Sequence, residues 1–334
     1  MQVWLEFAVC LALIAVAGYR LSLYGDMIAE KLGFTRTWVG VVMVASVTSL
    51  PELVTGLSSV TLAQTPEIAL GDILGACLIN LMMIVVLDFL HREESVYTRA
   101  HVGHTLAAGF GVVMLGLLAI NLLLTHAGMH IHILHVGLYS PLILLIYALA
   151  MRTIYRYEQM QALPTADVAD QRYRDTPLKH AVIGYVLAAL VVLAAGVWLP
   201  FVGKALASQH GWGESFVGTL FVAAVTSLPE AVVSIAAVRL GAVDMALGNL
   251  FGSNLFNIAI LAVDDLAYLP GPLLAAVEPT HAVSALSAMV MSGIAIVGLF
   301  YRARQRVLRT VGWVSLFLLT VYLFNSYAIY LYGH

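Results

Sequence analysis

Val47-Thr48-Ser49-Leu50-Pro51-Glu52 is a six-residue string that returns unchanged at Val225-Thr226-Ser227-Leu228-Pro229-Glu230. Both copies lie inside long apolar stretches. A proline removes a backbone donor from a helix, and a glutamate at bilayer depth costs about 3 kcal/mol or more. Because these two unfavourable residues recur together in both halves, the string predicts one functional site built from two related halves.

The composition is that of a membrane protein. The 334 residues are 61% hydrophobic and only 10% charged, with a net charge of −3 and a mean hydropathy of +0.93. A soluble domain has about 25% charged residues. The expected partner is therefore the lipid bilayer, and nucleic-acid binding is excluded. Cys10 and Cys77 fit neither a disulfide pattern nor a metal spacing, and we expect no cofactor and no protein partner.

Ten stretches are long and apolar enough to cross a bilayer as helices, which takes about 20 residues each. They are residues 3–19, 38–63, 67–90, 102–124, 133–150, 181–199, 216–238, 244–266, 281–300 and 310–330. The predicted fold is an all-α integral membrane protein with ten transmembrane helices.

The basic residues test this count, because cytoplasmic loops are enriched in Lys and Arg. With both termini outside, the alternating spans put all 16 Lys and Arg residues except Lys204 in cytoplasmic loops. One missed or added span would scramble this sorting. The polar residues 152–180 become a cytoplasmic linker, whose first third could be an amphipathic surface helix. The linker is too short for a folded regulatory domain, and this favours a prokaryotic inner membrane.

The two halves repeat each other. Residues 40–60 overlay 218–238 at a shift of 178, and 71–80 overlay 248–257 at a shift of 177. We divide the chain into a first half, 1–151, with its repeat at about 38–90, and a second half, 181–334, with its repeat at about 216–266. Five spans, an odd number, force the halves to insert in opposite orientations, as in transporters whose sites lie at mid-membrane. The prediction is two inverted five-helix repeats.

The residue types of the string suit a cation. Pro51 withholds an N–H from the carbonyl four residues earlier, and oxygens near Thr48 lose their helical partners. Such oxygens are tolerated at bilayer depth only where something else satisfies them. Glu52 follows Thr48 by four residues and shares its helical face, and Thr226 and Glu230 repeat the arrangement. Two carboxylates and several freed carbonyls predict a hard, all-oxygen site that suits Ca²⁺ better than zinc or copper.

Asn80 and Asn257 occupy matched positions in the two repeats. Each follows two glycines in small-xxx-small spacing, at 71 and 75 and at 248 and 252. Close helix packing is one explanation of the glycines, and an asparagine in a membrane helix can be only an interhelical hydrogen-bond partner. Because the positions match, we expect both asparagines to line the site.

With these residues, the chain resembles the sodium/calcium exchanger family of the cation/calcium antiporter superfamily. That family carries a Thr-Ser-Leu-Pro-Glu element and a Gly-Asn/Asp-x-x-Gly-Ser-Asn-x-x-Asn/Asp element. The first is intact in both repeats, whereas the second is intact at 248–257 and degraded at 71–80. The resemblance implies a transporter, not an enzyme, that exchanges Ca²⁺ for Na⁺ by alternating access.

The resemblance also implies ligands. Calcium would be held by Glu52, Glu230 and the backbone oxygens of Thr48 and Thr226. Sodium would be held by the same glutamates with Ser49, Ser227, Ser253 and the carbonyls of Ala45 and Ala223. Asn80 and Asn257 would line the central position.

Three residues depart from the family pattern. Ala76 stands where the family has Ser, Cys77 replaces Asn, and Asn257 stands where many members carry Asp. The calcium ligands survive, but one sodium site loses a hydroxyl. An exchanger coupled to H⁺ therefore remains an alternative.

Two other classes remain open: a passive cation channel and an intramembrane hydrolase. A hydrolase would need Asp88 and Asp265 to face each other, whereas inverted repeats put them on opposite sides. These aspartates and Asp264 are expected at hydrated helix ends or, alternatively, in a proton or cation relay. The loop histidines His126, His130, His132 and His135 have a spacing that could collect a soft metal.

Overall fold

The structure is a computed structural model that describes residues 1–31, 45–91, 95–129, 131–161, 177–302, 306–307 and 311–333. The described part of the first half contains α1 (Gln2–Lys31), α3 (Ala45–Thr48), α4 (Leu50–Ser58), the π-helix η2 (Ser59–Ala63), α5 (Pro66–Leu90), α6 (Val96–Arg99), α7 (His104–His126), β1 (His132–Ile133), β2 (Val136–Gly137) and α8 (Tyr139–Gln161). The second half contains α9 (Leu178–His210), α10 (Glu214–Phe216), the π-helix η3 (Val217–Val222), α11 (Ala223–Thr226), α12 (Leu228–Arg239), α13 (Val243–Ala267), the 3₁₀-helix η4 (Leu273–Ala275), α14 (His281–Tyr301), β3 (Arg306–Val307), β4 (Val311–Gly312) and α15 (Trp313–Tyr332).

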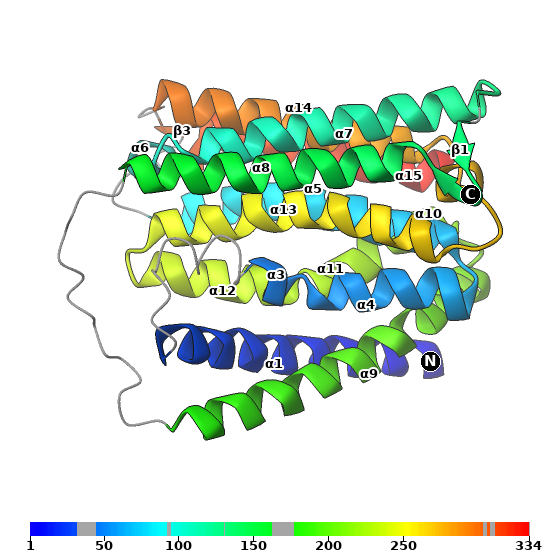
Figure 1. Ribbon diagram of the computed structural model, residues 1–334, viewed down its shortest axis with the longest axis horizontal. Helices are drawn as coiled ribbons and strands as arrows, with labels where there is room; N and C mark the ends of the chain where they lie inside the picture. The colour runs from blue at the N-terminus through cyan, green and yellow to red at the C-terminus, as the bar shows by residue number, and fades with distance from the viewer. Residues whose placement is uncertain are drawn as a thin grey trace.

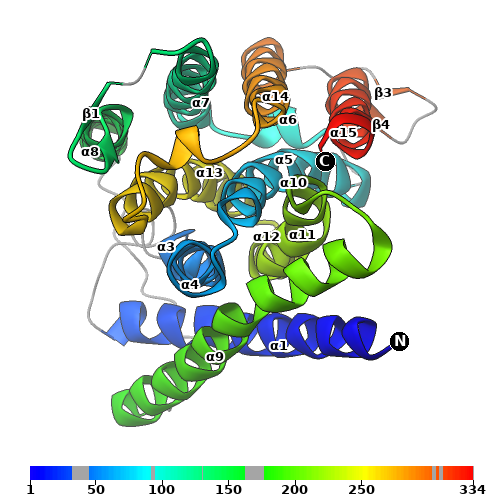
Figure 2. The ribbon, with the colours of Figure 1, turned by 90° about the vertical axis from the view of Figure 1, so that its right-hand side faces the viewer.

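The helices form three layers (Figures 1 and 2). Helices α7, α8, α14 and α15 cover one side, and α1 with α9 covers the other. Between them lie α5, α13 and the broken helices α3–α4 and α11–α12. The apolar stretches of α5 and α13 are 72% and 89% buried, more than any other candidate span of the described chain. The central layer is thus shielded from lipid, which is where a membrane protein can hold polar side chains.

Seven helices of the described residues are long and apolar enough to cross a membrane, or eight if the bent pair 214–226 and 228–239 is one span. Two of the ten predicted spans do not appear among them. Residues 38–44 of the span 38–63 lie outside the described residues, and Ser49 divides the rest into α3 and the shorter apolar helix Leu50–Ala63. The span predicted at 133–150 falls on α8, which carries Arg152, Arg156 and Glu158 in its last turns. The count of ten stays a prediction.

The limits of the fifth predicted span are wrong at both ends. Helix α8 begins at Tyr139 rather than at residue 133, because β1 and β2 pair as an antiparallel hairpin. Leu134 in that hairpin has a positive φ of 57°, which no helix allows. The helix then continues to Gln161, so the first part of residues 152–180 is helical. Residues 162–176 of the predicted linker lie outside the described part.

Helices α1 and α9 are longer than predicted. The span 3–19 becomes a helix that reaches Lys31, and 181–199 becomes a helix of 33 residues with Pro200 inside it. Gly211 at φ 65° ends α9, as a left-handed C-terminal residue does. The predicted limits were placed where the apolar residues end. A helix can continue through polar residues beyond that point, so both helices are longer than their apolar stretches.

The two copies of the string run in opposite directions (Figure 1). The chain passes from α3 to α4 toward the end of the molecule where both termini lie, and from α11 to α12 away from it. Contacts at the two ends are also matched. Glu67 Oε2 meets His281 Nε2 at 2.7 Å, and Asp244 Oδ1 meets His104 Nε2 at 3.0 Å. A shift of 177 residues carries Glu67 to Asp244 and His104 to His281.

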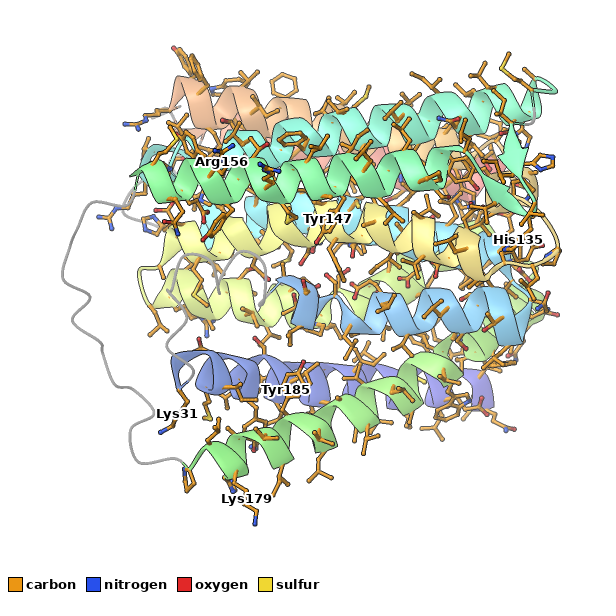
Figure 3. All side chains as sticks on the ribbon, viewed as in Figure 1. Lys31, His135, Tyr147, Arg156, Lys179 and Tyr185 are labelled. Atoms are coloured by element: carbon orange, nitrogen blue, oxygen red, sulfur yellow. The ribbon has the colours of Figure 1, made fainter. Side chains whose placement is uncertain are left out.

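Basic residues gather at one end of the bundle. Figure 3 shows Lys31, Arg156 and Lys179 at the end opposite His135. Both chain termini lie at the His135 end. These three residues share one end, as the alternating spans predict, whereas Arg20, predicted in a loop, lies inside α1.

Candidate functional site

Both copies of the string break their helices at the serine. Ser49, between α3 and α4, has φ −85° and ψ 15°, and Ser227, between α11 and α12, has φ −79° and ψ 4°. The helices on either side of Ser227 are bent by 47°. Pro51 and Pro229 give no N–H to the preceding turn, which accounts for the break. Each glutamate then lies in the first turn of its helix, where the helix dipole favours a carboxylate.

Each glutamate meets the serine of the opposite string. Ser49 Oγ donates to Glu230 Oε1 at 2.8 Å, and Ser227 Oγ lies 3.5 Å from Glu52 Oε1. Both glutamates are fully buried. The Oε2 atom of each has no hydrogen-bond partner. The structure therefore brings these four residues together, and we call them the two-glutamate site.

The threonines also cross between the repeats. Thr48 Oγ1 donates to Asn249 Oδ1 at 3.2 Å, and Thr226 Oγ1 donates to Asp72 Oδ1 at 2.8 Å. The sequence analysis missed Asp72 and Asn249 as site residues. They occupy the Asn/Asp position of the second family element, which was the available signal. Asp72 is a third buried carboxyl beside the site, and its Oδ2 has no partner.

The predicted central asparagines differ in their contacts. Asn80 Nδ2 donates to Asn254 Oδ1 at 3.1 Å, and Asn254 Nδ2 donates to the Cys77 carbonyl at 3.3 Å. Asn80 Oδ1 and both side-chain polar atoms of Asn257 have no partner. Asn254 is a third residue, after Asp72 and Asn249, that the sequence analysis did not assign to the site.

Two predicted sodium ligands already have hydrogen bonds. The carbonyl of Ala45 accepts from Ser49 N at 3.0 Å and from Thr48 Oγ1 at 3.1 Å. The carbonyl of Ala223 accepts from Ser227 N at 3.0 Å and from Thr226 Oγ1 at 3.3 Å. Each threonine has a single hydroxyl proton, which it also directs to Asn249 or Asp72, so a lone pair of each carbonyl remains available to an ion.

The two sides of the site differ at one pair of positions. Ser253 Oγ lies 3.4 Å from Glu230 Oε1 and 3.5 Å from Thr48 Oγ1. Its counterpart in the first repeat is Ala76, which has no hydroxyl to offer Glu52. Glu230 therefore has two hydroxyl partners, whereas Glu52 has one at the limit of hydrogen-bond distance.

The glycines of the first repeat allow close helix packing. A Cβ at Gly71 would lie 3.0 Å from Thr219 N, and one at Gly75 would overlap the Thr219 carbonyl. A Cβ at Gly218 would in turn lie 3.0 Å from the backbone of Ile68. α5 and η3 thus touch backbone to backbone, and this contact holds Asp72 opposite Thr226.

The oxygen atoms without partners decide what the site can do chemically. They are Glu52 Oε2, Glu230 Oε2, Asp72 Oδ2, Asn80 Oδ1 and Asn257 Oδ1. A buried acceptor without a partner is unfavourable, and the binding of a cation or of protons would satisfy these atoms. Within the described ranges, no group of three or more His, Cys, Asp or Glu side chains is arranged to hold a metal. The groups that the site offers to an ion are carboxylate, hydroxyl, amide and backbone oxygens.

Asp88 and Asp265 are hydrogen-bonded acceptors and not hydrated helix ends, because both are fully buried. Asp88 accepts from the backbone N–H of Val96 and Gly312 and from the hydroxyls of Ser95 and Ser315. Asp265 accepts from the backbone N–H of Gly137 and Leu273 and from the hydroxyls of Tyr139 and Ser140. The two bind loops at opposite ends of the bundle (Figure 1), so they do not face each other as a hydrolase requires.

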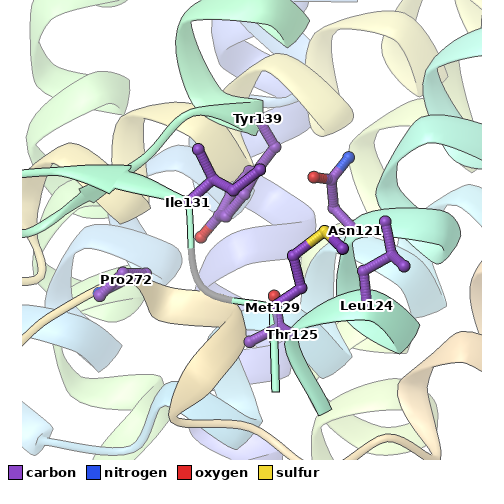
Figure 4. A pocket seen from close by; sticks show the side chains of 7 residues that line it. All are labelled: Asn121, Leu124, Thr125, Met129, Ile131, Tyr139 and Pro272. Carbon is purple, nitrogen blue, oxygen red and sulfur yellow. The ribbon is translucent and has the colours of Figure 1, made fainter. Parts of the chain in front are cut away.

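The loop histidines bond to backbone carbonyls. His126, His132 and His135 meet the carbonyls of Leu122, Leu134 and Leu266 at 2.9, 2.8 and 3.1 Å. His130 lies outside the described residues. Figure 4 shows a pocket beside this loop, lined by residues of α7 and the segment that follows it together with Tyr139 and Pro272, and none of these is a predicted site residue.

A family model described as "Sodium/calcium exchanger protein" matches residues 2–155 and 180–328, one match in each half of the chain. The chain belongs to the sodium/calcium exchanger protein family. It is therefore a multi-pass membrane protein of a transporter family in the cation/calcium antiporter superfamily, not of an enzyme family.

Individual proteins resemble this family member in sequence or in structure. Inner membrane protein YrbG of Escherichia coli (strain K12) is 25% identical over 265 residues, 79% of either chain. A solved structure of the H⁺/Ca²⁺ exchanger CAX covers 98% of this chain and 85% of its own, with a TM-score of 0.70 and 14% identity. The sodium-calcium exchanger NCX_Mj covers 97% of both chains, with a TM-score of 0.61 and 18% identity. These structural likenesses establish a common fold.

Proposed function

We propose that this chain is a secondary active antiporter that exchanges Ca²⁺ for Na⁺ by alternating access. The observation that carries the proposal is the pair of buried glutamates, each bonded to the serine of the opposite string and each with one oxygen free of partners. Two carboxylates neutralise one divalent cation. Ca²⁺ accepts 6–8 oxygen ligands in flexible geometry, which suits a mixture of carboxylate, hydroxyl and carbonyl oxygens.

The proposed ligands follow the two copies of the string. Ca²⁺ takes Glu52, Glu230 and the carbonyls of Thr48 and Thr226, which lie in the turns that Pro51 and Pro229 break. Na⁺ takes the same glutamates with Ser49, Ser227, Ser253, Ala45 and Ala223, and Asn80 and Asn257 line the centre. The crossed contacts between serines, threonines and acidic or amide side chains support this set.

The proposed architecture is ten transmembrane helices in two inverted five-helix halves, 1–151 and 181–334, joined by the linker 152–180. The opposite directions of the two motif helices support it, and so do the matched His–carboxylate pairs at the two ends. We place the termini outside and the linker in the cytoplasm, because Lys31, Arg156 and Lys179 share one end. The E. coli relative is named an inner membrane protein, which supports a prokaryotic inner membrane.

Coupling to H⁺ is the second candidate, because Ala76 deprives Glu52 of the hydroxyl that Ser253 gives Glu230. A site short of sodium ligands but rich in buried carboxyls suits protons. One of the solved structures with this fold is named an H⁺/Ca²⁺ exchanger.

Calcium flux into proteoliposomes separates these candidates. A sodium gradient without a pH gradient drives uptake in a Na⁺ exchanger, and a pH gradient without sodium drives it in an H⁺ exchanger. Uphill accumulation in either case excludes a passive channel. Glu52→Gln should abolish the flux, whereas Glu6→Gln, on the first turns of α1, should not. If Glu52→Gln transports Ca²⁺ as well as the unmodified chain, the site is wrongly assigned.

A further inference from the structure

Asp264 is a membrane carboxyl that the proposed Ca²⁺ site does not use. It lies near the end of α13 and is fully buried, and neither of its oxygens has a hydrogen-bond partner. Its neighbour Asp265 is equally buried but accepts hydrogen bonds from four donors. Asp265 therefore has hydrogen-bond donors around its carboxylate, whereas Asp264 has none.

Its position connects it to the two-glutamate site. The Asp264 carboxylate lies against Gly56 of α4, where a Cβ would overlap it. Gly56 follows Glu52 by four residues on the same helix, so it lies one turn, about 6 Å, beyond the glutamate. On α13, Asn257 precedes Asp264 by seven residues, two turns along the same face, and its side chain also has no partner. Asp264 therefore continues the row of unpartnered polar groups outward from the site.

The groups around Asp264 indicate whether it binds a proton or a metal ion. The charged groups that act on it are acidic: Asp72 on α5 and Asp265 on its own helix. Within the described chain, no Lys, Arg or His pairs with it. A divalent cation needs 6–8 oxygens, whereas a proton needs one. An isolated carboxyl among acidic neighbours in a dry layer holds a proton more readily than it holds a metal ion.

We propose that Asp264 is a proton-binding site that is loaded while the two-glutamate site lacks Ca²⁺ and is discharged when Ca²⁺ binds there. On discharge, the O–H bond of the carboxylic acid breaks, the electron pair stays on the carboxylate, and the proton leaves to water. The charge of the bound Ca²⁺ stabilises the Asp264 carboxylate, which lies against Gly56, one turn beyond Glu52 on α4. Only this coupling rests on the proposed function; the proton on Asp264 does not.

The site belongs to one half of the molecule. A shift of 177 residues carries Leu87 to Asp264, so the first repeat has an apolar residue at this position. Because Leu is the residue of the first repeat, we choose Asp264→Leu as one test variant and the isosteric Asp264→Asn as the other. Glu6→Gln serves as a control acidic substitution outside the central layer.

Infrared spectroscopy of the reconstituted protein tests the proton directly. Without Ca²⁺, the unmodified chain should show absorption from a protonated carboxyl that both Asp264 variants lack and Glu6→Gln retains. Proton release on Ca²⁺ addition, followed with a pH electrode in weakly buffered vesicles, should fall in both variants by about one proton per Ca²⁺ bound. Calcium binding itself should persist.

The outcomes separate the two proposals. If both variants keep the full carboxyl absorption, or release as many protons per Ca²⁺ as the unmodified chain, Asp264 is not the proton site. If the unmodified chain binds no Ca²⁺, the proposed function fails, and the absorption without Ca²⁺ still decides whether Asp264 is protonated. Should one substitution prevent folding, the other carries the measurement.

Discussion

At the scale of single residues, the two glutamates are tolerated because each has several favourable contacts. Each lies in the first turn of a helix, and each meets a serine hydroxyl from the opposite string. These contacts stabilise a buried carboxylate but leave one oxygen of each unused. The arrangement therefore remains incomplete until an ion or proton completes it.

Glu230→Gln should lower the affinity for Ca²⁺ by about 10- to 100-fold, because a buried contact to a charged group is worth about 1.5–3 kcal/mol. The amide keeps the size of the side chain but removes its charge. Isothermal titration with Ca²⁺ in detergent measures the change, with Glu6→Gln as the control. An unchanged affinity would show that the ion binds elsewhere.

Ala76→Ser should strengthen sodium dependence several-fold, because it returns to Glu52 a hydroxyl like the one Ser253 places 3.4 Å from Glu230. The measurement is the sodium concentration that half-maximally drives calcium flux. Ala69→Ser, an equally buried change two turns earlier on α5, is the matched control. If both variants need the same sodium concentration as the unmodified chain, position 76 does not limit sodium binding.

The residues that sequence reasoning placed best are those that recur inside one string. Glu52, Glu230 and the two serines lie together as the repeat implied. Asp72, Asn249 and Asn254 were missed because they lie outside the string, in the second family element, where only the glycines, Ser253 and the last asparagine of each copy were considered. Their contacts with the string depend on how the helices cross, which spacing along a single chain does not reveal.

At the scale of elements, two glycines lie where the outer helices touch the motif helices. A Cβ at Gly18 of α1 would overlap Pro229, and one at Gly196 of α9 would lie 3.0 Å from Val54. A shift of 178 residues relates Gly18 to Gly196. Because glycine has no side chain, neither contact has interlocking side chains, and the outer helices can move relative to the motif helices.

Gly18→Val should slow calcium flux by roughly tenfold, since overpacking a contact costs about 1–3 kcal/mol. Calcium affinity should stay close to that of the unmodified chain, because the ligands do not change. The control is Gly109→Val on α7, where a Cβ has nothing within 4 Å. Equal flux in the two variants would mean that this contact does not limit transport.

Asp265→Ala should lower the free energy of unfolding by about 3 kcal/mol or more. The substitution leaves buried donors without an acceptor, and each such donor costs about 1–3 kcal/mol. Asp88→Ala should have a similar effect at the other end of the bundle. Cys10 and Cys77 are buried, so a thiol-reactive dye reports thermal unfolding. Asp244→Ala is the control with a smaller expected loss, since the side chain of Asp244 is 58% exposed. A loss no larger in Asp265→Ala than in Asp244→Ala would contradict this assignment.

Element limits were less predictable than element existence. Apolar length located the cores of α5, α7, α13, α14 and α15 well. It misplaced the start of α8, because a hairpin anchored on Asp265 precedes that helix. It also ended α1 and α9 too early, because helices continue through polar residues beyond the apolar region.

At the scale of the whole molecule, the central layer is enclosed by helices on both sides, and the two motif helices run through it in opposite directions (Figures 1 and 2). This layout presents two equivalent half-sites to each other across the middle of the bundle. The matched His–carboxylate pairs and the matched aspartate anchors extend the same relation to the two ends. A repeat detected from two short strings thus organises contacts along the full length of the bundle.

Anomalous scattering from crystals grown with Ca²⁺ tests the central claim most directly. The account predicts one strong peak between the Glu52 and Glu230 carboxylates, at calcium–oxygen distances of about 2.3–2.6 Å, and a weaker peak in Glu230→Gln at the same Ca²⁺ concentration. A peak elsewhere in the molecule, with none between these two side chains, would contradict it.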